Sequence, residues 1–362
     1  MEVVDVAVVG GGPAGSSCAA FCAAAGLRVA VIEREKFPRE KVCGDCINPA
    51  CLGILERLGI AGEIQDLPHG VLNAVEFVTI QGRTVRASLA GARMIAIKRS
   101  IFDNRLLNRA RELGAQVHEQ STVVAIHKRP DGDWKLDAVR DTVLARVLVG
   151  ADGRNSTVAR FCNLLPRPER ERVALQAHVP LPPDFGNRIV LQFLSEGYSG
   201  QAPVNQTELD LCLVGTAGTI SSLRTWAEAK FNLPIDQQWR TITPLTRAPV
   251  PAAQDNLFFI GDAARVVEPF TGEGIYYAMR SGELAATAIA KILRGEDRNS
   301  IVREFVRAHR AMYRGRLWIN QFARGAVLHS RMASRLVGIT PISAPVLRWL
   351  TRKIVGAIVA QP

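Results

Sequence analysis

Several features that would place a protein in a special class are missing from this sequence. No apolar run approaches the roughly 18 residues that a membrane-spanning helix needs. The opening residues, MEVVDVAVVGGG, lack the basic start and the small-residue cleavage site of a secretory signal peptide. No internal repeat or low-complexity tract is found. These absences predict a globular, cytoplasmic protein.

Cysteine is too scarce and too scattered for a disulfide framework. The 362 residues contain seven cysteines, an odd number. Cys43 and Cys46 stand close together, but no second CxxC or Cys/His pair would complete four zinc ligands, so we expect no metal site. A redox dithiol beside a larger cofactor stays open, because CxxC spacing lowers the pKa of a thiol.

Acidic residues are almost absent from the end of the chain. Residues 301–362 hold eleven Lys and Arg but a single acid, Glu304, and so carry ten of the eleven net positive charges. Within this tail, the leucines and isoleucines of residues 344–360 form one helical stripe beside arginines. Three roles are open: association with an anionic membrane surface, steering of an acyl carrier protein, or docking on the body of the protein. No nucleic-acid-binding module accompanies the charge, so we expect no nucleic-acid partner.

The sequence does contain an alternation of buried strands and helices. Residues 4–10 (VDVAVVG) and 28–33 (RVAVIE) are apolar runs typical of strands covered on both faces, and an alanine-rich helix separates them. Such a βαβ unit predicts a parallel sheet with helices on its faces. Residues 75–98 predict a three-stranded meander, and residues 172–216 form a second strand-rich block.

These patterns predict an α/β fold in which two kinds of layer alternate along the chain. A nucleotide-binding domain is interrupted twice by pieces of a mainly antiparallel, substrate-binding sheet, and basic helices follow. The predicted boundaries are 1–72, 99–170 and 245–298 for the nucleotide-binding domain, 73–98 and 171–244 for the antiparallel sheet, and 299–362 for the C-terminal helices.

A glycine-rich turn joins the first strand to the first helix. Gly10, Gly12 and Gly15 follow the GxGxxG spacing in the strand-to-helix context that gives this motif its meaning. The first glycine permits a tight turn, the second lets the backbone approach a pyrophosphate, and the third lets the helix pack close to the strand. Glu33 ends the second strand, where its carboxylate can accept hydrogen bonds from ribose hydroxyls. The motif predicts a bound dinucleotide but does not separate FAD from NAD.

Two later turns bear on that choice. Residues 147–160 (VLVGADGRNSTVAR) end a strand with an Asp-Gly pair, and residues 256–279 (NLFFIGDAARVVEPFTGEGIYYAM) end one with Gly-Asp before a GxG helix start. In this order after GxGxxG, they resemble the FAD-dependent oxidoreductase superfamily of p-hydroxybenzoate hydroxylase, which includes group A flavin monooxygenases. Residues 41–49, KVCGDCINP, are most similar to its geranylgeranyl-reductase-like branch.

The resemblance implies a Rossmann-type FAD-binding domain of the glutathione-reductase and p-hydroxybenzoate-hydroxylase type, interleaved with the antiparallel sheet. It implies bound FAD, with NAD(P)H as a transient reductant. Asp262 would contact the ribityl chain, and Asp152 would lie near the pyrophosphate groove. The cofactor contacts expected from the motifs and the resemblance are Gly10, Gly12, Pro13, Ala14, Gly15, Glu33, Arg34, Lys41, Cys43, Gly44, Arg99, Val124, Asp152, Gly153, Gly261, Asp262, Pro269, Gly272, Gly274 and Ile275.

The same motifs are poor at naming the reaction. The WxWxIP motif of flavin-dependent halogenases is missing. We expect an NAD(P)H-dependent monooxygenase that hydroxylates a lipophilic or aromatic small molecule, polyketide- or prenyl-derived. The alternatives are a geranylgeranyl-reductase-like reductase of isoprenoid C=C bonds and a membrane-associated flavoprotein that serves as a redox or assembly partner. The candidate pocket residues are Cys43, Gly44, Cys46, Tyr198 and Gln201, whereas His178 is expected to be structural.

Overall fold

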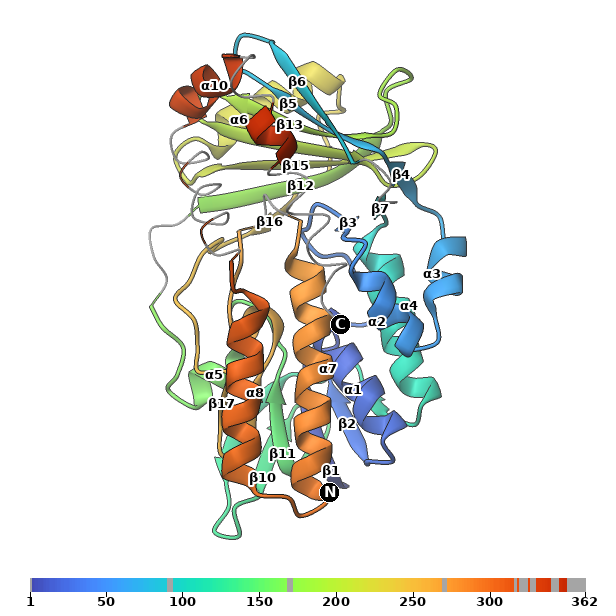
Figure 1. Cartoon of the computed structure of the whole chain (residues 1–362), viewed down its shortest axis with the longest axis vertical. Coiled ribbons are helices and arrows are strands. Elements are labelled where there is room, and N and C mark those ends of the chain that lie inside the picture. The colour runs from blue at the N-terminus through green and yellow to red at the C-terminus, as the bar shows by residue number, and fades with distance from the viewer. Residues whose placement is uncertain are drawn as a thin grey trace.

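Two sheet layers are stacked along the long axis of the molecule, with helices packed around the lower one (Figure 1). The computed structural model describes residues 2–89, 94–167, 172–268, 272–315, 318, 325, 330–339 and 345–349. The chain crosses between the layers several times, so each layer is assembled from segments that are far apart in sequence. This arrangement is the predicted α/β fold.

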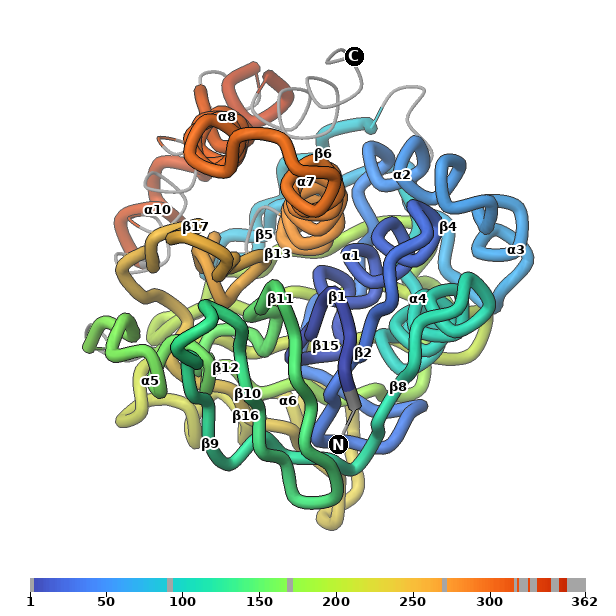
Figure 2. Tube along the Cα trace, turned by 90° about the horizontal axis from the view of Figure 1, so that it is seen from below, coloured from blue at the N-terminus to red at the C-terminus, as the bar shows by residue number. Residues whose placement is uncertain are grey.

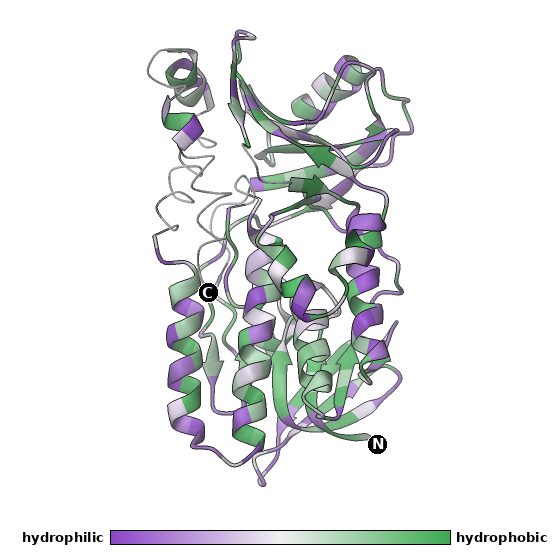
Figure 3. Ribbon diagram, turned by 45° about the vertical axis from the view of Figure 1, so that its right-hand side comes forward, coloured by the Kyte–Doolittle hydropathy of each residue, from purple (hydrophilic) through white to green (hydrophobic). Residues whose placement is uncertain are grey.

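The lower layer is an eight-stranded sheet with a parallel centre. β1 pairs in parallel with β2 and β11, β2 with β8, and β11 with β18, while β10 and β9 add an antiparallel extension. Its central strands are hydrophobic along most of their length, as expected for strands covered on both faces (Figure 3). The strands are β1 (Glu2–Val9), β2 (Val29–Ile32), β8 (Gln116–His118), β9 (Val123–Lys128), β10 (Trp134–Ala138), β11 (Thr142–Gly150), β17 (Ala253–Gln254) and β18 (Leu257–Phe259).

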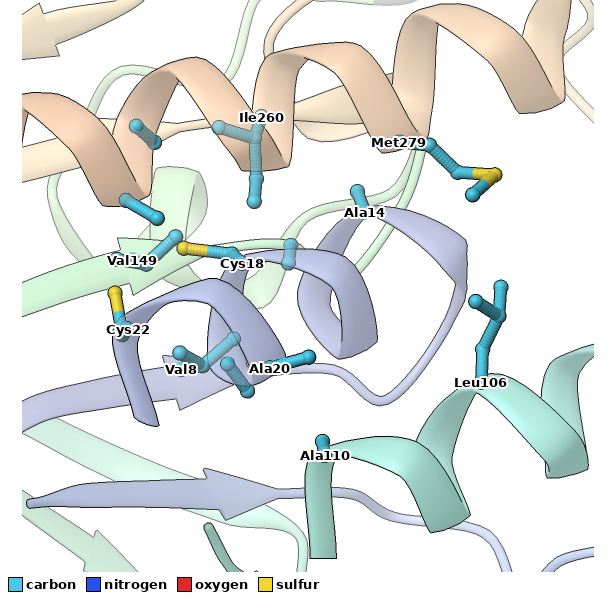
Figure 4. Close-up of a cluster of buried hydrophobic side chains, with 14 of the residues drawn as sticks. Val8, Ala14, Cys18, Ala20, Cys22, Leu106, Ala110, Val149, Ile260 and Met279 are labelled. Carbon is cyan, nitrogen blue, oxygen red and sulfur yellow. The ribbon is translucent and has the colours of Figure 1, made fainter. Parts of the chain in front are cut away.

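Helices α1 (Pro13–Ala24), α4 (Arg99–Glu112), α7 (Gly274–Leu293) and α8 (Arg298–Met312) pack along this sheet (Figure 2). α1 and α7 approach closely because Gly282 has no side chain: a Cβ there would stand 2.5 Å from the carbonyl oxygen of Ala14. Cys18 lies among the apolar side chains of this core (Figure 4). The close packing fixes the N-terminal ends of α1 and α7 relative to each other.

The upper layer is a seven-stranded, mainly antiparallel sheet in the order β16-β12-β15-β14-β13-β5-β6. One pair, β5 with β13, is parallel. Helix α6 (Ile220–Phe231) covers one face, and α10 (Ser330–Gly338) lies beside β6 and β13 (Figure 1). The strands are β5 (Ala74–Val78), β6 (Thr84–Ser88), β12 (Arg172–Pro180), β13 (Arg188–Leu194), β14 (Gly197–Pro203), β15 (Glu208–Thr216) and β16 (Arg240–Ile242).

The predicted three-stranded meander over residues 75–98 is wrong in its third strand. β5 and β6 pair as expected, but β7 (Met94–Ala96) joins a separate small sheet between β3 (Cys46–Ile47) and β4 (Gly70–Leu72). Alternation along a strand shows which residues are buried and does not identify the partner strand. The consequence is functional, because β7 fixes the strand that carries Cys46.

Short helices complete the structure: α2 (Cys51–Arg57), α3 (Ala61–Asp66), α5 (Thr157–Phe161) and the 3₁₀ turn η1 (Gly261–Ala263). Among the described residues, no helix is both long and apolar enough to cross a membrane. The predicted amphipathic stripe over 344–360 lies outside the described residues except for 345–349, where Leu347 packs against the upper sheet.

Candidate cofactor groove and substrate cavity

The glycine-rich turn after β1 is shaped by close approaches that a side chain would prevent. Gly10 has φ +103°, and a Cβ there would meet the carbonyl oxygen of Ala151 at 2.6 Å. A Cβ at Gly15 would stand 1.8 Å from the carbonyl oxygen of Gly10, so α1 packs on the turn as predicted. No side chain caps the first turn of α1, and its N–H groups face an open groove of about 500 Å³ that Gly12 lines.

Glu33 lies at the far end of this groove, as the sequence predicts. It is buried, and its two carboxylate oxygens accept hydrogen bonds from the backbone N–H groups of Gly11 (2.7 Å) and Glu35 (2.8 Å). Each carboxylate oxygen has two lone pairs, so the group can accept further hydrogen bonds from a ribose. Arg34 is exposed and also lines the groove.

A cluster of cations surrounds the middle of the groove. The buried carboxylate of Asp103 binds Arg99 through two 2.7 Å contacts and Arg39 at 3.0 Å. Burial and the neighbouring charge of Arg99 lower the pKa of Lys41 to about 8. In Arg154, which lines the same groove, the buried Nε has no hydrogen-bond partner within the described structure. Such a cluster fits a pyrophosphate, and the sequence did not identify Arg39, Arg154 or Asp103.

The two predicted strand-end acids have different roles. The carboxylate of Asp152 turns back and accepts hydrogen bonds from Ser156 Oγ (2.6 Å) and the N–H of Thr157 (2.6 Å), so it fixes the start of α5. Asp152 still borders the groove. Asp262 follows β18, lines the cavity described next, and accepts a hydrogen bond from Arg154 Nη2 at 3.0 Å. Asp152 therefore borders the groove, whereas Asp262 borders the adjoining cavity.

The groove continues into a second cavity, of about 250 Å³, between the two layers. Gly12, Lys41, Gly153 and Arg154 border both spaces. The lower wall contains predicted cofactor residues from α1 and α7 and from the connecting turns: Pro13, Ala14, Arg99, Gly153, Asp262, Gly272, Gly274 and Ile275. The upper wall is the inner face of the seven-stranded sheet, where Val75, Phe77, Ile189, Leu191, Ala202 and Val214 alternate inward.

The cysteine stretch lies in the wall between these two faces. Cys43, Gly44 and Cys46 all border the cavity, and both cysteines are free thiols. Burial raises the pKa of the Cys43 thiol and raises that of Cys46 well above its ordinary value. Burial thus works against the thiolate form that a redox dithiol requires.

The two other predicted pocket residues point to opposite faces of the upper sheet. Tyr198 points inward, and burial raises the pKa of its hydroxyl well above the ordinary value, with Glu268 adding to the effect. Gln201 borders the cavity, but strand alternation directs its side chain to the opposite face, where it donates to Ser199 Oγ at 3.1 Å. Gln201 therefore offers the cavity less polarity than expected.

Two predicted contacts fall elsewhere, and a third is not described by the structure. The side chain of Val124 is 54% exposed, and its neighbour Val123 lines the groove instead. The two residues alternate on β9, and the sequence could not show which of them faces inward. Gly261 packs against Ala14, where a Cβ would approach within 2.8 Å. Pro269 lies outside the described residues.

The structure also shows a polar cluster that the sequence did not identify. Asp45, His178 and Asp210 come from a loop, β12 and β15, and their ligand-type atoms lie within 4.8 Å of one another. His178 Nε2 is 2.7 Å from Asp45 Oδ2. The available signal was Asp210 itself, an acid in the otherwise apolar run ELDLCLVG. Asp210 is buried and lines the cavity.

These features define a class of protein that binds an extended dinucleotide beside a substrate. They are a glycine turn at a helix start, an acid placed to bind a ribose, a cationic middle and an adjoining apolar cavity. The particular family follows from comparison. Residues 3–183 and 222–315 match the family model described as FAD binding domain. The chain belongs to this family, and it is an FAD-dependent oxidoreductase. The orphaned Arg154 Nε and the turn around Gly10 are the features of the structure that fit FAD.

Curated relatives have several activities. Conditioned medium factor receptor 1 of Dictyostelium discoideum is 29% identical over 82% of this chain, which spans 65% of that protein. Menaquinone reductase of Mycolicibacterium smegmatis is 29% identical over 78% of this chain and 75% of that protein. Digeranylgeranylglycerophospholipid reductase of Thermoplasma volcanium is 26% identical over 82% of this chain and 80% of that protein.

Solved structures support the fold. A flavin-dependent brominase superposes with a TM-score of 0.78 at 21% identity, over 98% of this chain and 94% of that one. A probable FAD-dependent monooxygenase from Pseudomonas aeruginosa, PqsL, gives a TM-score of 0.71 at 20% identity, over 99% of this chain and all of that one. At such identities the likeness establishes the architecture and not the reaction.

Proposed function

We propose that this protein is a reductase that adds hydrogen across a carbon–carbon double bond of a long, apolar, isoprenoid-type substrate. The observation that carries the proposal is the inner face of the upper sheet. There Val75, Phe77, Ile189 and Leu191 form an apolar wall of the cavity that adjoins the cofactor groove. Such a wall offers a hydrocarbon chain extensive apolar contact and few directional hydrogen bonds.

The relatives support the same choice. One is named menaquinone reductase and another digeranylgeranylglycerophospholipid reductase, and each matches about four-fifths of this chain. Both names describe reductases. The stretch KVCGDCINP, whose resemblance to geranylgeranyl reductases was noted above, lies in the wall of the cavity.

The chain's own residues position the cofactor and keep the reaction dry. Gly10, Gly12 and the start of α1 receive the pyrophosphate, and Arg39 and Lys41 neutralise its charge. FAD, when bound and reduced, supplies a hydride to the substrate. The apolar wall excludes water from the reacting carbon. We expect NAD(P)H to reduce the cofactor.

Hydroxylation, the reaction that the sequence favoured, is the second candidate. It needs the same apolar cavity beside the cofactor, which is the observation in its favour. It ranks second because a buried acid, Asp210, has a role in adding hydrogen but none that hydroxylation requires.

A lipophilic substrate must be drawn from a membrane. The surface near α10 has side chains that favour binding to an anionic membrane. Met332, Leu336 and Ile339 are exposed, as is Trp349, whose ring stacks on that of Trp318. Exposed arginines on α10 lie beside them. The pairing of apolar and basic side chains is typical of a helix at a lipid surface. Flotation with anionic but not neutral vesicles is expected, and equal flotation with both would contradict it.

The test of the function is anaerobic. Purified holoprotein, pre-reduced with NADPH or dithionite, is mixed with an isoprenoid lipid that carries no quinone ring, and the product is analysed by mass spectrometry. We expect a gain of two hydrogen atoms in the prenyl chain. Under air, a product that has gained an oxygen atom instead would support the hydroxylase.

A further inference from the structure

A strip of polar side chains crosses the otherwise apolar inner face of the upper sheet. β12 and β15 pair so that Gln176 stands opposite Cys212 and His178 opposite Asp210. Side chains alternate along a strand, so these four point to the same side as Ala174, which lines the cavity. Asp210 and Cys212 line the cavity themselves. The strip therefore brings ionisable groups to a surface where the substrate lies.

Asp45 reaches this strip from the loop that carries Cys43. Its backbone φ of +53° lies in the left-handed region, which is unusual for a residue other than glycine. His178 Nε2 is 2.7 Å from Asp45 Oδ2 and 3.9 Å from Asp210 Oδ1. Gln176 Nε2 donates to Asp210 Oδ1 at 2.7 Å, while Asp45 Oδ1 has no hydrogen-bond partner among the described residues. His178 Nε2 is therefore hydrogen-bonded to Asp45 and lies beyond hydrogen-bond distance of Asp210.

The surroundings favour a proton on one of these carboxyls. Burial raises the pKa of Asp210 well above its ordinary value, and the charge of Asp45 acts in the same direction. Burial also raises the pKa of Asp45, although its hydrogen bond with His178 opposes this. The other titratable groups that face the cluster are Glu40, Lys98, Arg99, Glu208, Cys43, Cys46 and Cys212. Two buried carboxylates this close are not both ionised without cost, so Asp210 is the protonated member.

We propose that Asp210, held by Gln176 beside the His178–Asp45 pair, is the acid that protonates the substrate. This inference rests on the proposed reductase function. Addition of hydrogen breaks the π bond and forms two C–H bonds. One carbon receives a hydride, with its electron pair, from the reduced cofactor. The other receives the proton of Asp210, whose O–H bond breaks to leave a carboxylate.

After the reaction, Asp210 must regain its proton and the cofactor its two electrons. A proton from solvent re-forms the O–H bond of Asp210. Glu208, two residues before Asp210 on the same face of β15, is part-exposed. A nicotinamide then returns two electrons to the cofactor.

The same three residues also have the composition of a metal site. His178 Nε2 and Asp45 Oδ2 are 2.7 Å apart, within hydrogen-bond distance. Metal content is therefore part of the test.

The experiment compares wild-type holoprotein with Asp210→Asn, Asp210→Glu and His178→Gln. Asp255→Asn is the control, an exposed acid on the far layer. Infrared spectroscopy in H₂O and D₂O should show a protonated-carboxyl band at neutral pH in the wild type and control that disappears in Asp210→Asn. Anaerobic single-turnover oxidation of the reduced cofactor by an isoprenoid lipid that carries no quinone ring should slow by about a hundredfold or more in Asp210→Asn, with partial recovery in Asp210→Glu. His178→Gln tests the metal alternative.

Each result decides one point. A wild type without the carboxyl band, or an Asp210→Asn protein that transfers hydrogen at the wild-type rate, would overturn the proposal. So would one equivalent of bound metal that is lost in His178→Gln. If the wild type reduces no isoprenoid, the proposed function fails. The infrared band then still shows whether Asp210 is protonated, and its absence separately refutes the proposed role of Asp210.

Discussion

The cofactor groove and the substrate cavity adjoin each other but are built in different ways. The groove depends on backbone: turns at Gly10 and Gly15 permit approaches that no side chain would allow. The cavity depends on side chains, one or two from each of several strands, and many apolar substitutions would preserve its character. A cofactor common to a family requires one geometry, whereas substrates differ among members of a fold. The groove is therefore rigidly specified, whereas the cavity can be rebuilt for another reaction.

The sharpest test of this difference is a side chain at Gly15. Gly15→Val places atoms within 1.8 Å of the carbonyl oxygen of Gly10, a clash that only a shift of α1 can relieve. We expect loss of FAD binding and of most folded protein, measured by flavin absorbance and thermal unfolding. Gly62→Ala, where nothing lies within 4 Å, should leave both unchanged. A yellow, stable Gly15→Val protein would break the comparison.

The next largest effect is expected at Asp103. Asp103→Asn leaves Arg99 and Arg39 without their buried counter-charge, which should destabilise the fold by about 3–5 kcal/mol in urea unfolding at pH 7. The exposed pair of Glu63 with Arg105 is the control, and Glu63→Gln should leave the urea midpoint nearly unchanged.

The same variant has a pH signature. Burial opposes ionisation of Asp103, but the adjacent Arg99 charge prevails and holds the pKa of Asp103 below its usual range. The stabilisation is therefore fully present above the unfolded pKa of about 3.9 and is lost as the pH falls through the folded value. The stability difference between wild type and Asp103→Asn should be constant near neutrality and shrink in acid.

On the cavity side, Leu191→Trp should affect substrate and spare the cofactor. Leu191 faces Gly200 across the inner wall, so a larger ring fills space that a hydrocarbon chain would occupy. We expect KM for a prenylated substrate to rise roughly tenfold or more while FAD affinity stays constant. Arg86→Trp, on the exposed side of the same sheet, serves as the control. Equal losses of FAD and substrate binding would show that the two sites are not separable.

The smallest predicted effect concerns Lys41, which borders both spaces. Its pKa of about 8 means that the apoprotein loses this positive charge as the pH rises through that value. FAD affinity should fall by about tenfold between pH 7 and 9, and Lys41→Gln should abolish this dependence. Lys36→Gln, an exposed neighbour on the same loop, should keep the wild-type profile. Fluorescence titration measures both.

The sequence predicted the groove better than the cavity, for a physical reason. Gly10, Gly15 and Glu33 serve requirements that are local in sequence, so their spacing is diagnostic. Arg39 and Asp103 were missed because their contact depends on how α4 packs against the loop that follows β2. Asp210 and His178 were missed as a pair because their contact depends on strand register, which a single sequence does not show. The prediction of a third strand in the meander was wrong for the same reason, because the sequence does not show which strand it pairs with.

The interleaving of the two layers has a consequence for how the protein is made. The lower sheet joins residues 2–9 to residues 142–150 and these to residues 257–259, and the upper sheet joins residues 74–78 to residues 188–194. Neither sheet is complete until more than half of the chain has left the ribosome, so neither layer can finish folding ahead of the other. Pairings this distant in sequence favour slow folding. The protein therefore gains its ability to hold a cofactor late and in one step, and truncated chains should be targets for proteolysis instead of partial enzymes.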